Sequence, residues 1–420
     1  MTETTCSCPE FGRTSRRGFL KGAAGVAGAA VLTRTVGDAF TQVSFGATTS
    51  PNVLVVLSMR GGADGLSLVV PHADLGYALA RPTIAVPTSA LLAKDASFGL
   101  HPGLQPLLPM WDAGTFGAVH AVGLPQPNRS HFTAMEEVED ADPGSPERRG
   151  WINRMIGQIG ASAPQDAVQL GSGVVPTSLY GVSPVLALGK IAKVGLPGPS
   201  DAETQRLRRV AYDMLWQGQQ GPLGRGARSA LTTAANLTSL NDVVVRPQNG
   251  ARYPVGDLGT TLAETATLIR ARVGARVITV DYGDWDMHIN VGTLDGGAMA
   301  TNAAELGQAL GAFFDDLGEQ ASTVTVVTIS EFGRRLEQNG NRGLDHGWGS
   351  CMFLLGAGVR GGRVHADWPG LDDAALEDGD LAVTTDYRSV LTEVVRARFP
   401  DVNASQVFPG FVPGTVGTML

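Results

Sequence analysis

Five apolar runs of strand length alternate along the chain with segments of helical periodicity, and this alternation limits the possible folds more than any other feature. Continuous apolar runs are typical of strands that are covered on both faces of a sheet. They lie at residues 52–57, 117–122, 275–280, 322–329 and 352–355. Apolar residues recur with helical spacing at residues 131–139, 203–216, 258–270, 300–317 and 387–398. The pattern predicts an α/β fold with a mostly parallel sheet.

We expect one large domain over residues 50–412, because single α/β domains reach this size and no repeat of fixed period is visible. Residues 200–250 interrupt the alternation and are expected to form a helical insertion. Within them, apolar side chains recur at helical spacing at Leu207, Val210, Ala211, Met214 and Leu215. We expect this stripe to pack in a core or a lid.

Residues 1–39 have the features of an export signal. Arg16 and Arg17 are followed by an apolar run at residues 22–32, which is too short to span a membrane as a helix. Paired arginines in this position indicate the twin-arginine route, so we expect the export machinery as a partner and a periplasmic, cell-surface or secreted destination. Without this segment the chain keeps one cysteine, Cys351, and can form no internal disulfide bond.

The charge balance excludes two classes of partner. The chain carries 32 Lys and Arg against 40 Asp and Glu, and removal of residues 1–39 changes the formal net charge from −8 to −10. An acidic surface argues against nucleic acid and against anionic membrane surfaces. We expect no stable membrane span after cleavage, because no other apolar stretch is long enough.

Acidic residues and histidines gather next to the ends of the expected strands. In open α/β sheets ligands bind beyond the carboxyl ends of the strands, so we expect these side chains to lie close together. Asp64 follows the first run and His131 the second, Asp286 and His288 follow the run at 275–280, Glu331 follows the next, and Asp345 and His346 precede the last.

Carboxylate oxygens and imidazole nitrogens together suit Zn²⁺, Mn²⁺ or a similar ion. Asp286 and His288 are two residues apart and would point to the same side of an extended segment. Asp284 and His288 are four apart and would share a side if the segment were helical. The sequence leaves both pairings open, together with the simpler interpretation of Asp286 as a turn residue and His288 as a loop histidine.

Ser130 has two interpretations. It precedes an expected helix and can be its N-cap. It can also be a metal-activated nucleophile at the helix N-terminus, where the helix dipole favours an anion. Arg129 would then hold a phosphate or sulfate oxygen, as could Arg60 and Arg334, and His131 would be a ligand, a proton donor or a packing residue.

Several short motifs together resemble a known bacterial family, the one called domain of unknown function 1501. They are Arg-Gly-Gly-Ala-Asp-Gly at 60–65, Asn-Arg-Ser-His-Phe at 128–132, Asp-Trp-Asp-Met-His-Ile-Asn at 284–290, Ser-Glu-Phe-Gly-Arg at 330–334, Asp-His-Gly at 345–347 and Asp-Tyr-Arg-Ser-Val-Leu at 386–391. The resemblance covers nearly all of residues 50–412. The family in turn resembles the alkaline phosphatase and sulfatase superfamily, which implies a doubly wound α/β sheet with a metal-assisted site at the strand ends.

The resemblance also implies roles for individual residues. Asp64 is similar to the metal-binding acid after the first strand, and Ser130 lies where the nucleophile would be. Asp286 and His288 are similar to the ligand pair of one ion, and Glu331 and His346 to parts of the other ligand motifs. The chain departs from the superfamily at Phe332, which stands where a ligand histidine is expected. Asp345 could replace that ligand, so the resemblance implies one or two divalent ions, zinc, manganese or calcium.

Two functions are compatible with these residues and this resemblance. The first is an exported metal-dependent hydrolase of small-molecule or polymer-borne phosphate or sulfate esters, with a serine nucleophile. The alternative is a catalytically degenerate relative that acts as a binding or secretion-linked module, which Phe332 favours.

Overall fold

A computed structural model describes residues 52–420, with gaps at 161–162, 192–195, 197, 200, 222, 225–226, 229, 233 and 236–244. The predicted export signal at residues 1–39 lies outside the described residues, as does part of the predicted helical insertion. The described residues belong to one compact unit. No helix in the described part of the chain is long and apolar enough to cross a membrane.

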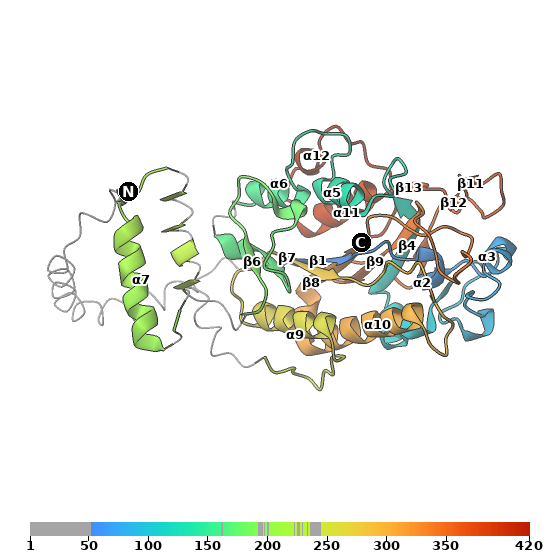
Figure 1. Cartoon of the computed structure of the whole chain (residues 1–420), viewed down its shortest axis with the longest axis horizontal. Coiled ribbons are helices and arrows are strands. Elements are labelled where there is room, and N and C mark those ends of the chain that lie inside the picture. Colours follow the sequence, from blue (N-terminus) through green and yellow to red (C-terminus); the bar gives the residue numbers. More distant parts are fainter. Residues whose placement is uncertain are drawn as a thin grey trace, which may run out of the picture. The chain divides into compact units, whose positions relative to one another are not determined.

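A nine-stranded sheet forms the centre of the unit, in the order β10-β4-β9-β8-β1-β7-β5-β6 with β13 beside β4 (Figure 1). Strand β9 runs antiparallel to β4 and β8, and the other strand pairs in this sheet are parallel. The prediction of a mostly parallel α/β sheet is therefore confirmed. The strands are β1 (Val53–Met59), β4 (Phe116–Gly123), β5 (Ala167–Leu170), β6 (Leu186–Leu188), β7 (Val277–Tyr282), β8 (Val324–Ile329), β9 (Ser350–Gly356), β10 (Val364–His365) and β13 (Thr385–Asp386).

Helices cover both faces of the sheet, as a doubly wound fold requires (Figure 1). One face packs against α9 (Asp257–Arg270) and α10 (Ala298–Leu317) in one apolar cluster. The other face packs in a second cluster against α5 (His131–Asp140), α6 (Trp151–Gln158), α11 (Tyr387–Arg398) and α12 (Ala404–Val407). Every residue of β1 is buried between these layers, which explains its continuous apolar sequence.

The five predicted strands and five predicted helices are all present, including α7 (Ala202–Trp216) in the predicted insertion. No residue of α7 is buried, so its apolar stripe does not pack in a core within the described residues. The remaining short elements are α2 (Gly65–Leu68), α3 (Leu75–Ala80), α4 (Leu108–Asp112), β2 (Val69–Val70), β3 (Gly99–Leu100), β11 (Leu376–Glu377), β12 (Asp380–Leu381) and the 3₁₀ turns η2 (Thr88–Ala90), η3 (Pro102–Leu107), η4 (Pro164–Asp166), η5 (Thr177–Leu179) and η7 (Gly318–Thr323).

The direction of β9 brings a further segment to the functional edge of the sheet. β1, β7 and β8 are mutually parallel, so their carboxyl ends lie at the same edge. β9 is antiparallel to β8, and so its amino end lies at that edge instead. The residues that precede β9, including Asp345 and His346, therefore arrive beside the residues that follow β7 and β8.

Asp64 has a structural role that differs from the metal-binding role implied for it. Its carboxylate forms a two-pronged ion pair with Arg81, with distances of 2.6 Å from Nη1 to Oδ2 and 3.0 Å from Nη2 to Oδ1. The side chains of Asp64 and Arg81 are 2% and 0% exposed. Burial raises the pKa of Asp64, but the neighbouring Arg81 guanidinium lowers it by a larger amount. The pKa of Asp64 therefore lies below its usual value. Both oxygens are therefore engaged by Arg81, and Asp64 is not part of the group of donor atoms formed by His131, Asp286 and His346.

We predict that Arg81→Met lowers the free energy of unfolding by about 3–5 kcal/mol, because it leaves the Asp64 carboxylate buried without its counter-charge. Urea denaturation at neutral pH measures this loss. The double variant Asp64→Leu/Arg81→Met buries no charge and should lose less than the single variant. A loss below about 1 kcal/mol in Arg81→Met would show that the pair does not carry this energy.

Candidate metal centre

Three imidazoles and one carboxylate converge at the carboxyl edge of the sheet. His131 is the first residue of α5, Asp286 and His288 lie in the segment after β7, and His346 precedes β9. The Nε2 atoms of His288 and His346 are 2.9 Å apart. Oδ1 of Asp286 lies 3.4 Å from Nε2 of His131. The same oxygen lies 3.1 Å from Nε2 of His288 and 3.3 Å from Nε2 of His346.

In each of the three imidazole rings the other nitrogen, Nδ1, faces a hydrogen-bond acceptor. Nδ1 of His131 lies 2.9 Å from Oε1 of Glu331, and Nδ1 of His288 lies 2.9 Å from Oδ1 of Asp345. Nδ1 of His346 lies 2.8 Å from the backbone carbonyl oxygen of Arg129. Carbonyl and carboxylate oxygens only accept, so each Nδ1 is the donor and each neutral ring presents a lone pair at Nε2.

This donor set fits a divalent cation. Donor atoms of His131, Asp286 and His346 all lie within 4.8 Å of one another. Nε2 of His131 is buried and has no hydrogen-bond partner within the described residues, which leaves its lone pair unsatisfied. Imidazole nitrogens whose other N–H is held by a carboxylate or carbonyl are the usual ligands of zinc. His288 lies beside these three residues and offers a further imidazole.

Arg334 fixes the loops that carry this cluster, and it is not free to clamp an anion. Its side chain is fully buried and donates to the carbonyl oxygens of Gly62 (2.7 Å), Leu344 (2.9 Å) and Trp285 (3.0 Å), and also to that of Gly61. Nη2 also lies 2.7 Å from Oδ1 of Asp286. Burial raises the pKa of Asp286, but Arg334 lowers it by a larger amount. The pKa of Asp286 therefore lies below its usual value, and the carboxylate stays ionised.

Two glycines permit the close approach of these loops. Gly61 has a φ of +112°, and a Cβ atom there would lie 2.5 Å from the backbone nitrogen of Asp286. A Cβ atom on Gly343 would lie 1.8 Å from the carbonyl oxygen of His288. Any side chain at either position would push the segment that carries Asp286 and His288 out of place.

Glu331 and Phe332 contact the histidines of the cluster. Glu331 is 3% exposed, and its Oε1 accepts from the backbone N–H of Gly61 at 2.8 Å as well as from His131. The ring of Phe332 lies 4.9 Å from that of His131 and 4.7 Å from that of His346. An apolar ring therefore packs against two of the three imidazoles and offers no ligand atom of its own.

Ser130 is the N-cap residue of α5, but its side chain makes no capping hydrogen bond. Within the described residues, its hydroxyl has one hydrogen-bond partner, Oγ1 of Thr133 at 3.4 Å. The hydroxyl is exposed at the helix N-terminus, next to His131. The guanidinium of Arg129 is paired with Asp378 and Asp380, so the contact of this residue with the cluster is through its backbone carbonyl.

The structure brings together six of the predicted site residues, His131, Asp286, His288, Glu331, Asp345 and His346. Of the two pairings that the sequence allows, it has Asp286 with His288, because the segment 283–290 contains no helix. No sequence signal marks Arg334 as an internal anchor, since an arginine after a strand is equally compatible with a surface position. Asp64 is the predicted ligand that lies elsewhere.

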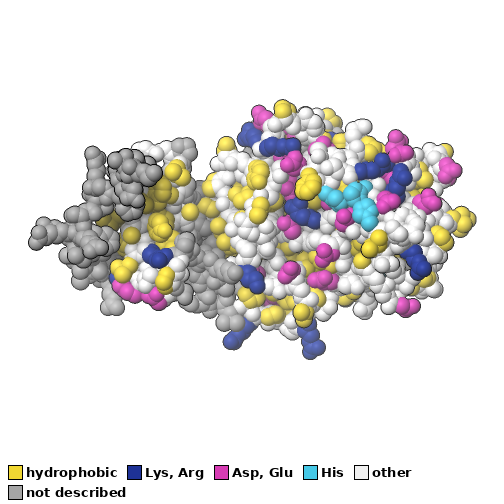
Figure 2. Space-filling view, in the orientation of Figure 1, with side chains coloured by type: hydrophobic (Ala, Val, Ile, Leu, Met, Phe, Trp, Pro, Cys, Tyr) yellow, Lys and Arg dark blue, Asp and Glu magenta, His cyan; other side chains and the backbone are white. Residues whose placement is uncertain are grey.

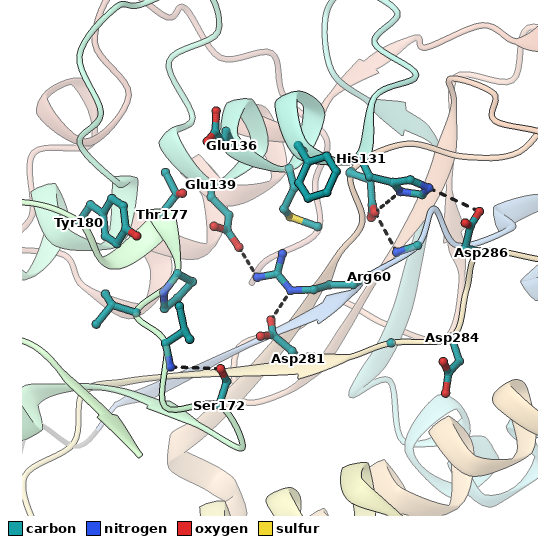
Figure 3. A pocket seen from close by; sticks show the side chains of 18 residues that line it. Arg60, His131, Glu136, Glu139, Ser172, Thr177, Tyr180, Asp281, Asp284 and Asp286 are labelled. Atoms are coloured by element: carbon teal, nitrogen blue, oxygen red, sulfur yellow. Dashed lines mark hydrogen bonds and ion pairs between the residues drawn. The ribbon is translucent and has the colours of Figure 1, made fainter. Parts of the chain in front are cut away.

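A pocket of about 700 Å³ opens beside the cluster, and His131, Asp286 and Glu331 line one end of it. In Figure 3, Arg60 reaches into this pocket between Glu139 and Asp281. Figure 2 shows the histidines at the surface of this face of the molecule, with acidic and apolar side chains next to them.

We predict that Arg334→Lys destabilises the protein by at least about 3 kcal/mol, because one ammonium cannot satisfy the several buried oxygens that the guanidinium reaches, and each unsatisfied group costs about 1–3 kcal/mol. Urea denaturation tests this. The exposed Arg363 offers a matched control, and Arg363→Lys should leave the midpoint unchanged. Equal midpoints for the two variants would contradict the anchoring role.

Comparison with solved structures finds several proteins similar in fold at low identity. The C-terminal periplasmic domain of EcEptC from Escherichia coli is 10% identical, with a TM-score of 0.38 over 88% of this chain and 90% of that one. A putative sulfatase from Bacteroides thetaiotaomicron VPI-5482 is 9% identical, with a TM-score of 0.34 over 88% of this chain and 73% of that one. The alkaline phosphatase from the Antarctic bacterium TAB5 is 10% identical, with a TM-score of 0.29 over 76% and 95%.

No curated protein matches the chain. The family described as Protein of unknown function (DUF1501) matches residues 111–390, which is more than half of the 420 residues. The chain therefore belongs to the DUF1501 family, which its sequence motifs also indicated.

Proposed function

We propose that this chain is a metal-dependent hydrolase that holds a single divalent ion between His131, His288, His346 and Asp286. One observation carries the proposal: donor atoms of His131, Asp286 and His346 lie within 4.8 Å of one another, Nε2 of His288 lies 2.9 Å from Nε2 of His346, and every Nδ1 is engaged on the other side of its ring. Three imidazoles favour zinc over manganese or calcium, which prefer oxygen ligands. Phe332 supports one ion rather than two, because it packs against His131 and His346 where a second ligand set would stand.

The proposed substrates are phosphate or sulfate esters, small or polymer-borne. The N-terminus of the ten-residue helix α5 lies at the cluster and favours an anion through its free N–H groups. A bound divalent ion would supply Lewis acidity toward an ester oxygen. Glu331 holds His131 in the tautomer that a ligand needs, and Arg334 keeps Asp286 ionised. Ser130 is the proposed nucleophile, since this exposed residue is the N-cap of α5 and directly precedes the proposed ligand His131 in the sequence.

We further propose that residues 1–39 direct export by the twin-arginine route, so that the site acts outside the cytoplasmic membrane. The paired Arg16 and Arg17 before a short apolar run support this.

A metal-holding binding or secretion-linked module without turnover is the second candidate. This candidate is favoured because the three arginines that were expected to hold an anion are all paired with carboxylates or buried. Arg60 is paired with Glu139 and Asp281, Arg129 with Asp378 and Asp380, and Arg334 is fully buried. None of the three offers an unpaired guanidinium to a phosphate or sulfate group.

We predict that the metal-free protein binds one equivalent of Zn²⁺ in a calorimetric titration. His346→Ala removes a ligand and should weaken binding by at least about 100-fold, and Glu331→Gln should weaken it by about 10–100-fold through the orientation of His131. His365→Ala, in a partly exposed histidine of β10, should have no effect. Two equivalents, or an affinity that His346→Ala does not change, would exclude the proposed site.

We predict that the zinc-loaded protein hydrolyses an aryl phosphate or aryl sulfate, and that Ser130→Ala lowers kcat by at least about 1,000-fold with unchanged zinc affinity. Ser322→Ala, at the opposite end of β8, should keep the activity of the unmodified chain. Zinc binding without turnover above the metal-free protein would favour the binding module, and an active Ser130→Ala would exclude this serine as the nucleophile.

A further inference from the structure

His288 is the most exposed of the three imidazoles in the cluster. Its side chain is 42% exposed, against 29% for His131 and 22% for His346. Its partner Asp345 is 53% exposed, and a contact between two exposed side chains stabilises one geometry only weakly. The position of the His288 ring therefore depends on what holds its backbone and its partner.

One side chain, Asn339, contacts both the backbone of His288 and the carboxylate of Asp345. Nδ2 of Asn339 lies 2.9 Å from the backbone carbonyl oxygen of His288 and 3.1 Å from Oδ1 of Asp345. The same carboxylate oxygen accepts from Nδ1 of His288 at 2.9 Å. The carboxamide, the carboxylate and the imidazole thus form a closed ring of contacts, which fixes the imidazole relative to its own backbone.

The oxygen of the Asn339 carboxamide holds the loop from which it comes. Oδ1 accepts from the backbone N–H groups of Asn341 and Gly343, each at 2.9 Å. The nitrogen is engaged by His288 and Asp345, so both ends of the carboxamide are used. A side chain without an amide cannot make both sets of contacts.

The segment after β7 and the segment before β9 also pair through their backbones. The N–H of Val291 donates to the carbonyl oxygen of Arg342 at 2.9 Å, and the N–H of Leu344 donates to that of Met287 at 2.9 Å. These bonds do not involve the Asn339 side chain. Loss of its carboxamide should therefore loosen the imidazole that it holds and leave the two segments paired.

His346 is held independently of Asn339. Nδ1 of His346 lies 2.8 Å from the backbone carbonyl oxygen of Arg129, and its backbone pairs with that of Arg334 in an isolated bridge. A change of the Asn339 side chain should therefore act on a bound ion through His288 and spare His346.

We propose that Asn339 is the positioning residue of His288 and that it makes this exposed histidine an effective ligand. The inference rests on the metal centre of the proposed function, and it does not depend on hydrolysis. Asn339 contacts neither the ion nor a substrate. It acts by presenting Nε2 of His288 in a fixed place, so that an arriving ion does not have to order an exposed side chain.

A double-mutant cycle on Zn²⁺ affinity, measured by calorimetric titration of the full chain, tests the proposal. Asn339→Ala should weaken zinc binding by at least about 10-fold, as the loss of a partner of a ligand does. In the His288→Ala background, which keeps His131, Asp286 and His346, the same change should weaken it by less than about twofold. An equal loss in both backgrounds would overturn the proposal, because the effect would not pass through His288.

Asn341→Ala is the matched control. Asn341 lies in the same loop, its side chain is exposed, and its contact with Asn339 is made by its backbone N–H. This change should leave the zinc affinity unchanged. A loss as large as that in Asn339→Ala would overturn the assignment, because the loop as a whole and not the Asn339 carboxamide would then set the affinity.

A measurement on the metal-free protein separates this inference from the proposed function. Long-range proton–nitrogen NMR spectra at about pH 8, where a free imidazole is neutral, report which ring nitrogen of His288 carries the proton. We expect Nδ1 in the unmodified chain and in Asn341→Ala, and a mixture of both tautomers in Asn339→Ala. If no zinc binds while this difference is seen, the metal centre is rejected and the positioning role stands. Equal tautomer populations in Asn339→Ala and the unmodified chain would overturn the positioning role alone.

Discussion

The arrangement of the site depends on three hydrogen bonds, each donated by the Nδ1 atom of one imidazole ring. Glu331, Asp345 and the carbonyl of Arg129 each accept from one Nδ1, so the neutral rings of His131, His288 and His346 carry their lone pairs on Nε2, and Nε2 of His288 faces Nε2 of His346 at 2.9 Å. Lone pairs at 2.9 Å repel unless a proton or a cation lies between them. The carboxylate of Asp286 adds negative charge at the same point, which makes a divalent cation the natural partner.

The fold brings these groups together from four separate stretches of sequence. The parallel strands β7 and β8 end at the same edge of the sheet, and the antiparallel β9 begins there. Arg334 then joins the loops by donating to backbone carbonyls in three of them, while Gly61 and Gly343 leave room for close contact. The rigidity of the site thus comes from a buried guanidinium and tight backbone packing rather than from the ligands alone. The same loops, with α5, bound the pocket beside the cluster.

The sequence predicted the strands, the main helices and most of the cluster, because continuous apolar runs identify buried strands and ligands gather at strand ends. The sequence did not indicate the ion pair of Asp64, because its partner Arg81 lies 17 residues away in a segment without any recognisable motif. Burial and pairing also decide the state of Arg60, Arg129 and Arg334, and neither is visible in a one-dimensional pattern. The pocket beside the cluster escaped prediction since Glu136 and Glu139 look like ordinary residues of an amphipathic helix, and the segment 172–180 carries no chemical signal.

The most direct test of the metal centre is anomalous X-ray diffraction at the zinc edge from crystals of the full chain grown with Zn²⁺. We expect a single anomalous peak at bonding distance, about 2.0–2.2 Å, from Nε2 of the three histidines and from an oxygen of Asp286. A peak at another position, two peaks on either side of Phe332, or no peak at all in zinc-containing crystals would contradict a single-ion site at this cluster.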